Sequence, residues 1–333
     1  MAELLSVENL HVAFQTHAGL VHAVDGVSYS VAKGEIVAIV GESGSGKSVS
    51  ARAVMGLVPQ PPGIVGPGRI LFDGQDLLTL DDEQIRHIRG RRIAMIFQEP
   101  MTSLNPVIGI GRQMTEAMRL HLGYSRAQAT ERAIELLRMV GISEPAQRMK
   151  QFPHHLSGGM RQRVMIAMAL ACEPELIIAD EPTTALDVTI QAQILTVMQD
   201  LCQRLGVALV IITHNLGIVA RYAQRVNVMY AGRIVEQGEA ETLYRHPRHP
   251  YTAGLLNSVP RLDRSRDEPL VPIPGNPPDL MRPPKGCAFA PRCAYATEAC
   301  DEKPALVTDE NGHSAACWNT GALALALSRG AAA

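Results

Sequence analysis

The fold of this 333-residue chain is decided by the stretch Gly41-Glu-Ser-Gly-Ser-Gly-Lys47-Ser48. It fits the pattern G-x-x-x-x-G-K-[ST], in which glycines let backbone N–H groups converge on phosphate oxygens. The mainly apolar run from Glu35 to Val40 precedes it, as in a strand buried on both faces of a sheet, and a helix-like segment from Lys47 to Leu57 follows. Helix N-termini attract anions, so the sequence predicts a phosphate site, with Lys47 at the β- and γ-phosphates and the Ser48 hydroxyl on Mg²⁺.

Buried-strand patterns recur along the rest of the chain. They cover Arg92 to Phe97, Leu176 to Asp180 and Ala208 to Thr213, and a helical pattern spans Val188 to Leu205. Strands that alternate with helices predict an α/β core with a mainly parallel sheet. From about residue 109 to residue 171 we find helical patterns without a convincing strand, which predicts a helical insertion in this core.

The composition changes after His249. The segment from Pro260 to Pro284 holds eight of the 22 prolines, so it cannot form a regular helix and is expected to be an extended linker. Four cysteines follow it. We therefore expect a core domain over residues 1–250, with a helical subdomain at about 100–165, and a Pro-rich linker and Cys-cluster extension over residues 251–333.

Charge and hydrophobicity narrow the class of protein. Hydrophobic residues make up 46% of the chain and the net charge is −2. Nucleic-acid-binding proteins usually carry a basic surplus or stripe, so we expect no nucleic-acid partner. No apolar run approaches the roughly 18 residues of a membrane span, and no signal-peptide pattern is present. We expect a soluble chain whose membrane role depends on partners.

A second group of chemical residues is Asp180 and Glu181, which end the apolar run from Leu176. Buried carboxylates are costly without a partner, so two acids at the end of a buried strand indicate a function. Asp180 is placed to hold Mg²⁺ directly or through water, and Glu181 to orient and deprotonate an attacking water. The alternative is that both acids only cap the next turn.

A third group is Ser157-Gly158-Gly159, between Leu156 and Met160. Ser-Gly-Gly at the start of a helix makes a second anion-receptive N-terminus. Taken alone, the motif is weak, and a plain helix N-cap is the more common explanation of it.

Together, Gly41 to Ser48, Leu156 to Met160 and Leu176 to Glu181, in this order, resemble the nucleotide-binding subunit of ABC transporters. The resemblance covers about the first 250 residues. It implies a P-loop NTPase core, whose mainly parallel sheet carries an antiparallel β portion, and a helical ABC subdomain. It also implies that two subunits pair head to tail, so that Ser157, Gly158 and Gly159 contact the ATP held by the partner.

The resemblance assigns roles to further residues. It implies ATP contacts at Phe14, Gly41, Glu42, Ser43, Gly44, Ser45, Gly46, Lys47, Ser48 and Gln98, and Mg²⁺ ligands at Ser48, Gln98 and Asp180. Glu181 and His214 become the catalytic pair, with His214 as the switch histidine at the γ-phosphate. Phe14 is also explained as a core strand residue. Met160 replaces the usual glutamine and Asn215 the usual aspartate, which puts the rate of hydrolysis in doubt.

The kind of ABC protein follows from what accompanies the cassette. The chain has one phosphate loop, no fused membrane helices and no room for long coiled coils, which favours a separate importer ATPase. His246-Pro-Arg-His-Pro-Tyr-Thr252 resembles the C-terminal signature of ATPase subunits of dipeptide, oligopeptide and nickel importers. We expect it to energise a bacterial importer of di- or oligopeptides. Nickel or another small solute, and an ATP-driven clamp outside transport, remain alternatives.

The same resemblance implies the partners and the location. We expect a second, related ABC ATPase subunit, two transmembrane permease subunits and, indirectly, an extracytoplasmic solute-binding protein. The chain would lie peripherally on the cytoplasmic face of the cell membrane.

The tail cysteines are Cys287, Cys293, Cys300 and Cys317, with five, six and sixteen residues between successive members. The short C-x₂₋₄-C pair of most zinc sites is absent. Four thiolates suffice for an iron–sulfur cluster, and the importer group implies a [4Fe–4S] cluster here. Zn²⁺ and unliganded or disulfide-bonded thiols are the alternatives.

Overall fold

The computed structural model describes residues 3–98, 103–183, 187–258 and 272–323. The chain divides into two compact units. Unit 1 consists of Met1–Leu4, Val31–Ile36 and Asp76–Ile212, and unit 2 of Leu5–Ser30, Val37–Gln75 and Thr213–Ala333.

Unit 1 is built on three parallel strands, β7 (Ile93–Ile96), β8 (Leu176–Asp180) and β9 (Ala208–Thr213). In their register, Ile178 of β8 pairs with Met95 of β7 and with Val210 of β9. Every residue of β8 is buried, as expected for a strand covered on both faces. The helix α8 (Val188–Leu205) connects β8 to β9, since parallel neighbours need a crossover connection.

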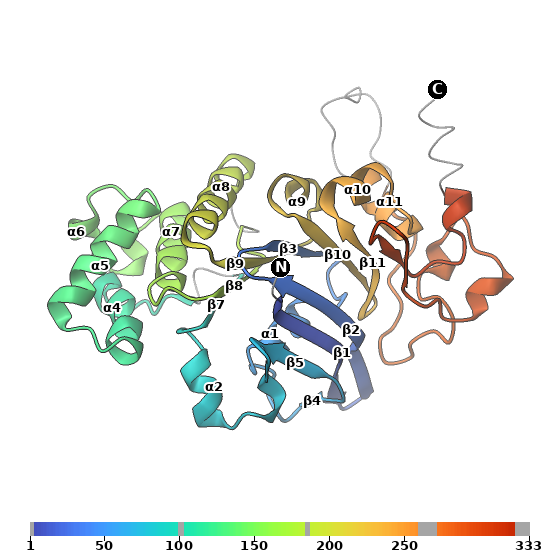
Figure 1. Ribbon diagram of the computed structural model, residues 1–333, viewed down its shortest axis with the longest axis horizontal. Helices are drawn as coiled ribbons and strands as arrows, with labels where there is room; N and C mark the ends of the chain where they lie inside the picture. Colours follow the sequence, from blue (N-terminus) through green and yellow to red (C-terminus); the bar gives the residue numbers. More distant parts are fainter. Residues whose placement is uncertain (1–2, 99–102, 184–186, 259–271, 324–333) are drawn as a thin grey trace. The chain divides into compact units, whose positions relative to one another are not determined.

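The chain between β7 and β8 is helical among the residues that the structure describes there. It contains α4 (Ile110–His121), α5 (Arg126–Met139), α6 (Pro145–Arg148) and α7 (Gly158–Ala169), and α2 (Asp82–Ile88) precedes β7. Figure 1 shows α4 to α7 grouped together. Ile110, Met114 and Met118 of α4 recur every four residues and are fully buried, so one face of this helix forms core.

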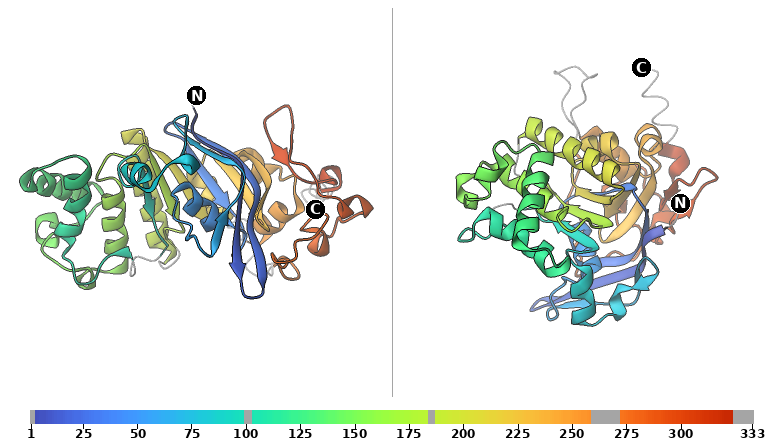
Figure 2. Two further views of the ribbon diagram at one scale, coloured as in Figure 1. Left: turned by 90° about the horizontal axis from the view of Figure 1, so that it is seen from below. Right: turned by 60° about the vertical axis from the view of Figure 1, so that its left-hand side comes forward.

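One sheet of unit 2 contains two long neighbouring strands, β1 (Glu3–Thr16) and β2 (Gly19–Ala32), which lie side by side in Figure 2. On its other edge, β1 pairs antiparallel with β4 (Gly63–Val65) and β5 (Arg69–Phe72), and β6 (Gln75–Asp76) follows β5. This is the antiparallel portion that the family resemblance implied.

A second set of strands in unit 2 carries the phosphate loop. Val37–Val40 of β3 (Ile36–Val40) pair parallel with Arg225–Val228 of β10 (Arg225–Tyr230). The order then continues antiparallel through β11 (Arg233–Glu239), β13 (Ser314–Ala315) and β12 (Val307–Thr308). The described part of this unit also contains the helices α1 (Lys47–Val54), α9 (Leu216–Tyr222), α10 (Ala240–Arg245) and α11 (Pro250–Asn257). Strands β12 and β13, which lie after residue 300, thus extend this sheet.

A buried carboxylate joins the extension to this sheet. Glu236 of β11 is fully buried and accepts hydrogen bonds from the main-chain N–H groups of Arg248 (2.6 Å) and His249 (2.9 Å). Nε2 of His313, in the extension, lies 2.8 Å from the same carboxylate. Buried polar groups need such partners, so Glu236 holds the start of α11 and the β12–β13 turn together.

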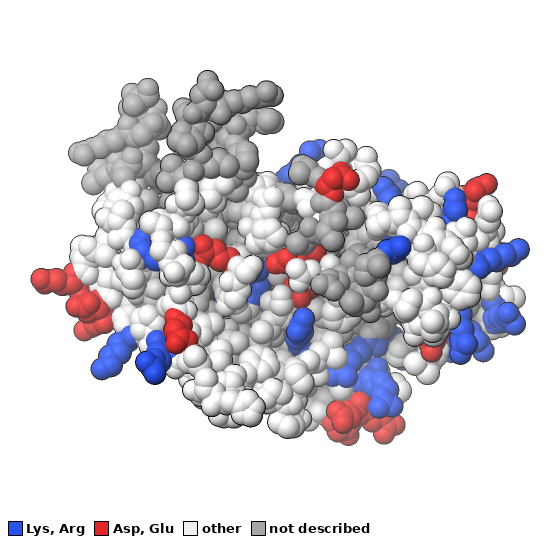
Figure 3. Space-filling view, turned by 180° about the vertical axis from the view of Figure 1, so that it is seen from behind, with Lys and Arg blue, Asp and Glu red and all other residues white. Residues whose placement is uncertain are grey.

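The charged surface is mixed. Figure 3 shows acidic and basic side chains intermixed on the face that it draws. Within the described ranges, no helix has both the length and the apolar character that a membrane span requires.

The buried His249 makes stability depend on pH. Burial lowers the pKa of His249 from 6.5 to about 4, and its Nδ1 accepts a hydrogen bond from the Tyr251 N–H (3.1 Å). The neutral imidazole therefore fits the folded state. The neutral His249 stabilises the folded state fully above its ordinary pKa of 6.5, and this stabilisation is lost as the pH falls toward the lowered pKa. The loss amounts to ~3 kcal/mol of the free energy of unfolding.

The variant His249→Asn tests this expectation. Asparagine keeps a side-chain oxygen that can cap α11 but does not titrate. Thermal midpoints measured from neutral pH down to about pH 4.5 should fall less steeply in the variant than in the wild type. Parallel curves would show that another group causes the acid sensitivity.

Candidate functional site

The phosphate loop lies between β3 and α1 and folds as its sequence predicts. Helix α1 begins at Lys47, and Gly46 before it adopts a left-handed conformation (φ +98°). The ammonium of Lys47 is buried and donates to the carbonyl oxygens of Gly41 (2.8 Å) and Glu42 (2.9 Å). These bonds fix the lysine over the loop's own main chain, so its positive charge is held at the loop.

Two glycines of the loop are required by close backbone approaches. A Cβ at Gly41 (φ +155°) would lie 2.2 Å from the Met229 carbonyl oxygen. A Cβ at Gly46 (φ +98°) would lie 2.2 Å from the Ala23 carbonyl oxygen. Both conformations are ones that glycine alone adopts easily. The loop is therefore shaped by main chain packed directly against it.

The Ser45 side chain of the loop is suited to bind a phosphate oxygen. Ser45 is buried, and its hydroxyl oxygen has no hydrogen-bond partner within the described chain. A buried hydroxyl without a partner is costly, and a phosphate oxygen is a strong acceptor for it. Ser45 and the amides around it therefore fit the phosphates of ATP. Ser48, in the first turn of α1, carries the hydroxyl expected on Mg²⁺.

The two carboxylates lie at the C-terminal end of β8. Asp180 and Glu181 are 2% and 9% exposed. Glu181 has a left-handed backbone (φ +47°), and its N–H donates to the Ile212 carbonyl (2.9 Å). Such a conformation is unfavourable for a residue with a side chain and is typical of functional sites. The strained main chain thus sets the direction of the Glu181 side chain.

Gln98 contacts this carboxylate. Its Nε2 donates to Oε2 of Glu181 across 3.0 Å. Gln98 follows β7 and Glu181 follows β8, so the parallel pairing of these strands brings their C-terminal ends together. The structure thus joins two residues that the sequence analysis had placed in one site by resemblance alone.

The Ser-Gly-Gly segment begins α7. The Ser157 hydroxyl accepts a hydrogen bond from the Met160 N–H (3.3 Å), as an N-cap does. Ser157 and Gly158 are exposed. The N-cap interpretation is therefore confirmed, and it leaves the open end of this helix available to a second function.

The remaining predicted residues are His214 and Phe14. His214 follows β9 and is exposed, and the next N–H, of Asn215, donates to the Thr213 hydroxyl (3.1 Å). Phe14 lies half-buried on β1, opposite Gly63. Gln98, Asp180, Glu181 and Ser157–Gly159 belong to unit 1, whereas Phe14, the phosphate loop and His214 belong to unit 2.

The tail cysteines form a loose group. The pKa of Cys317 is raised to about 11, mainly by burial and in smaller part by the other three thiols, against the lowering effect of the Asn319 N–H. Backbone N–H groups of Tyr295 and Asn319 donate to the sulfurs of Cys293 and Cys317 (both 3.3 Å), and the Asn319 amide lies 3.8 Å from the Cys300 sulfur. Among the described residues, however, no three His, Cys, Asp or Glu side chains are arranged to hold a metal ion. The expected cluster is not supported by this geometry.

Known proteins resemble the chain over almost its whole length. The oligopeptide transport ATP-binding protein OppD of Bacillus subtilis is 52% identical, over 96% of this chain and 89% of that protein. The dipeptide transport protein DppD of the same organism is also 52% identical, over 96% and 95%. This chain belongs to the ATP-binding subunits of ABC transporters. It is accordingly an ATPase.

Family models and solved structures agree with this membership. Residues 24–184 match the ABC transporter model, and residues 235–300 match the oligopeptide/dipeptide transporter C-terminal region. The dimeric ATP-binding cassette MJ0796, bound to ADP and phosphate after hydrolysis, superposes with a TM-score of 0.64 at 27% identity, over 71% of this ABC subunit and 98% of that chain. The ABC cassette fold expected from the sequence is confirmed.

The structure also assigns residues that the sequence analysis did not. Tyr251 and Arg292 both bind Glu42 of the phosphate loop. The family signature around Tyr251 pointed to that region without indicating a contact. Nothing in the sequence distinguishes Arg292 except its position beside Cys293.

Proposed function

We propose that this ABC subunit hydrolyses ATP jointly with a second ABC ATPase subunit and so drives di- or oligopeptide import through two membrane permease subunits. The observation that carries the proposal is Glu181, held by its left-handed backbone and by Gln98 at the end of a buried strand. The names of the relatives, which refer to oligopeptide and dipeptide transport, support the cargo. In such a system the chain works at the cytoplasmic face of the membrane.

Each residue has a task in the proposed reaction. Lys47 and the loop amides neutralise charge on the transferred phosphoryl group, and Glu181 takes the proton of the attacking water. Ser48, Gln98 and Asp180 would hold Mg²⁺, which would supply positive charge to offset that of the phosphates. His214 completes the site at the γ-phosphate.

The other half of the reaction is proposed to come from the partner. The start of α7, where Ser157 and Gly158 are exposed and Gly159 is half-buried, suits a phosphate held by a second subunit. Hydrolysis should therefore depend on dimer formation.

Co-purification tests the transport role. The tagged subunit, expressed in its own host, should be recovered with two polytopic membrane proteins, and peptide with its binding protein should stimulate the ATPase of that complex. Stimulation by nickel alone would correct the cargo. Recovery with ribosomes or DNA in place of membrane proteins would overturn the transport role in favour of an ATP-driven clamp.

For the tail we propose an iron–sulfur cluster, [4Fe–4S], at Cys287, Cys293, Cys300 and Cys317. The proposal rests on the resemblance to the importer group and not on the arrangement of the described side chains, which is not that of a metal site. N–H groups directed at three of these sulfurs are contacts that tune a cluster once it is bound. Iron and sulfide content after anaerobic purification tests it. A colourless protein that contains zinc would replace it by the alternative.

A further inference from the structure

Arg292, in the C-terminal extension, contacts the phosphate loop. Arg292 donates from Nη1 to Oε2 of Glu42 (2.8 Å) and from Nη2 to Oε1 (3.0 Å). Glu42 is the second residue of the loop, and the two residues are 250 positions apart in the sequence. A paired arrangement of this kind fixes direction as well as distance, which a single contact does not.

The surroundings of Arg292 hold it in one position. Its side chain is only 4% exposed, and its Nε donates to the Pro274 carbonyl (2.8 Å). The guanidinium carbon lies 5.8 Å from the centre of the Tyr230 ring and 5.9 Å from that of Phe289. The hydrogen bonds with Glu42 raise the pKa of Arg292 above its already high value. The arginine is therefore a fixed, charged support.

Tyr251 holds the main chain at the same residue. Its hydroxyl accepts a hydrogen bond from the Glu42 N–H (2.7 Å), and its side chain is fully buried. The Tyr251 ring packs at 4.6 Å from Tyr230 and 5.5 Å from Phe289. Both the side chain and the amide of Glu42 are thus bound by residues beyond position 250. These contacts set the path of the loop at its first peptides.

We propose that Arg292 is a positioning residue for the phosphate loop, through which the C-terminal extension controls ATP hydrolysis. By holding Glu42, it keeps the Gly41–Lys47 main chain in the conformation that receives the phosphates. If Arg292 no longer holds Glu42, the main chain of the loop can shift. The N–H groups of the loop and Lys47 then no longer lie where the transition state needs them. The proposal rests on the proposed function of this loop in ATP hydrolysis.

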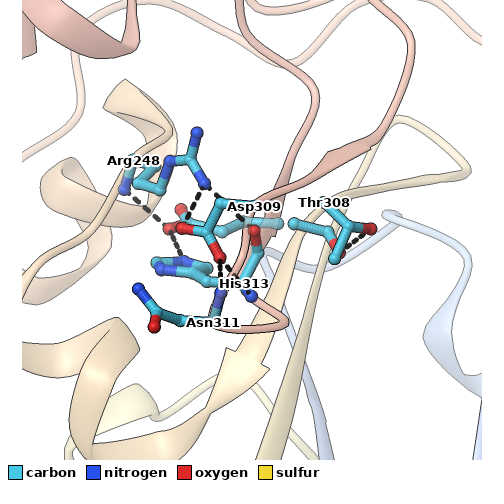
Figure 4. Close-up of polar contacts among 7 residues, drawn as sticks. Arg248, Thr308, Asp309, Asn311 and His313 are labelled. Atoms are coloured by element: carbon cyan, nitrogen blue, oxygen red, sulfur yellow. Dashed lines mark hydrogen bonds and ion pairs between the residues drawn. The ribbon is translucent and has the colours of Figure 1, made fainter.

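Arg248, just before the extension, provides a matched control because it binds a different part of the C-terminal segment. Nη1 of Arg248 donates to Oδ2 of Asp309 (2.8 Å) and to the His313 carbonyl (3.0 Å). Figure 4 shows Arg248, Asp309 and His313 in this arrangement, with Asn311 beside them. These bonds attach the β12–β13 turn and do not involve the loop. Arg248→Ala therefore removes an anchor of comparable kind without touching the ATP site.

The test compares the full-length variants Arg292→Ala, Arg292→Lys and Glu42→Gln with Arg248→Ala. Arg292→Ala should lower kcat/KM for ATP about tenfold, and Arg292→Lys should recover part of this loss because lysine still reaches one carboxylate oxygen. Arg248→Ala should stay within about twofold of the wild type. Thermal midpoints are measured for every variant.

A double-mutant cycle separates positioning from general stability. If Arg292 acts through Glu42, adding Glu42→Gln to Arg292→Ala should cause little further loss of kcat/KM. The proposal would be overturned if the two substitutions lowered kcat/KM additively. It would also be overturned if Arg248→Ala lowered kcat/KM as much as Arg292→Ala for the same decrease in thermal midpoint. Wild-type kinetics of Arg292→Ala would overturn it as well. If Arg292→Ala does not fold, the same cycle is run with Arg292→Lys. Absence of ATPase activity from the wild-type chain assembled with its partner subunit would instead refute the proposed function.

Discussion

Replacing Glu181 by glutamine is expected to lower kcat for ATP hydrolysis by about 10²–10³-fold, because the water then has no general base. Glutamine has nearly the same shape as glutamate, and its amide can still pair with the Gln98 side chain, now 3.0 Å from the carboxylate. The affinity for ATP should therefore stay close to that of the wild type. Glu181→Gln removes an interaction that is needed only in the transition state. Its loss therefore lowers kcat and leaves KM unchanged.

The control for this prediction is Glu175→Gln. Glu175 precedes the same strand at its opposite end, where its carboxylate pairs with Nε of Arg92 (2.5 Å). It is far along β8 from the site, so phosphate release should be unchanged within about twofold. Steady-state phosphate release and ATP titration measure both variants. Hydrolysis at the wild-type rate in Glu181→Gln would show that another residue is the base.

The sequence predicted the parts of the fold whose pattern is continuous. Three elements have the predicted bounds: the strands Leu176–Asp180 and Ala208–Thr213 and the helix Val188–Leu205. Short buried apolar runs indicate strands, and a helical repeat kept over 18 residues indicates a helix, so few other assignments fit these segments. The hairpin of β10 and β11 was not predicted. Its turn residues, Ala231 (φ +48°) and Gly232 (φ +79°), have the conformation of a tight hairpin turn, but Ala-Gly lacks the Asn-Gly signal.

For the site, the sequence predicted residues better than contacts. Glu181 was identified from the end of a buried strand and Gln98 from the family resemblance, and the parallel pairing of β7 and β8 makes them neighbours. No sequence pattern predicts the contact between Glu42 and Arg292, because the two residues are 250 positions apart and only the tertiary fold brings them together. The cysteine spacing likewise predicted a group of thiols, but spacing does not fix the side-chain directions that metal ligation requires.

Two glycines of one loop allow a comparison that isolates the effect of a close backbone approach. Both Gly44 (φ +79°) and Gly46 (φ +98°) have left-handed conformations, so alanine at either position costs about 1–2 kcal/mol in conformation. At Gly44 a Cβ would meet nothing within 4 Å, whereas at Gly46 it would lie 2.2 Å from the Ala23 carbonyl oxygen. Only the second substitution forces main chain apart.

We therefore expect Gly46→Ala to bind ATP at least about tenfold more weakly than Gly44→Ala, since the shifted N-terminus of α1 no longer directs its amides and Lys47 at the phosphates. Titration with a fluorescent ATP analogue measures both affinities, and thermal unfolding shows whether each variant keeps its fold. Equal affinities would mean that the loop can move away from Ala23 at no cost. The ATP site would then be set by the conformation of the loop alone and not by the strand packed against it.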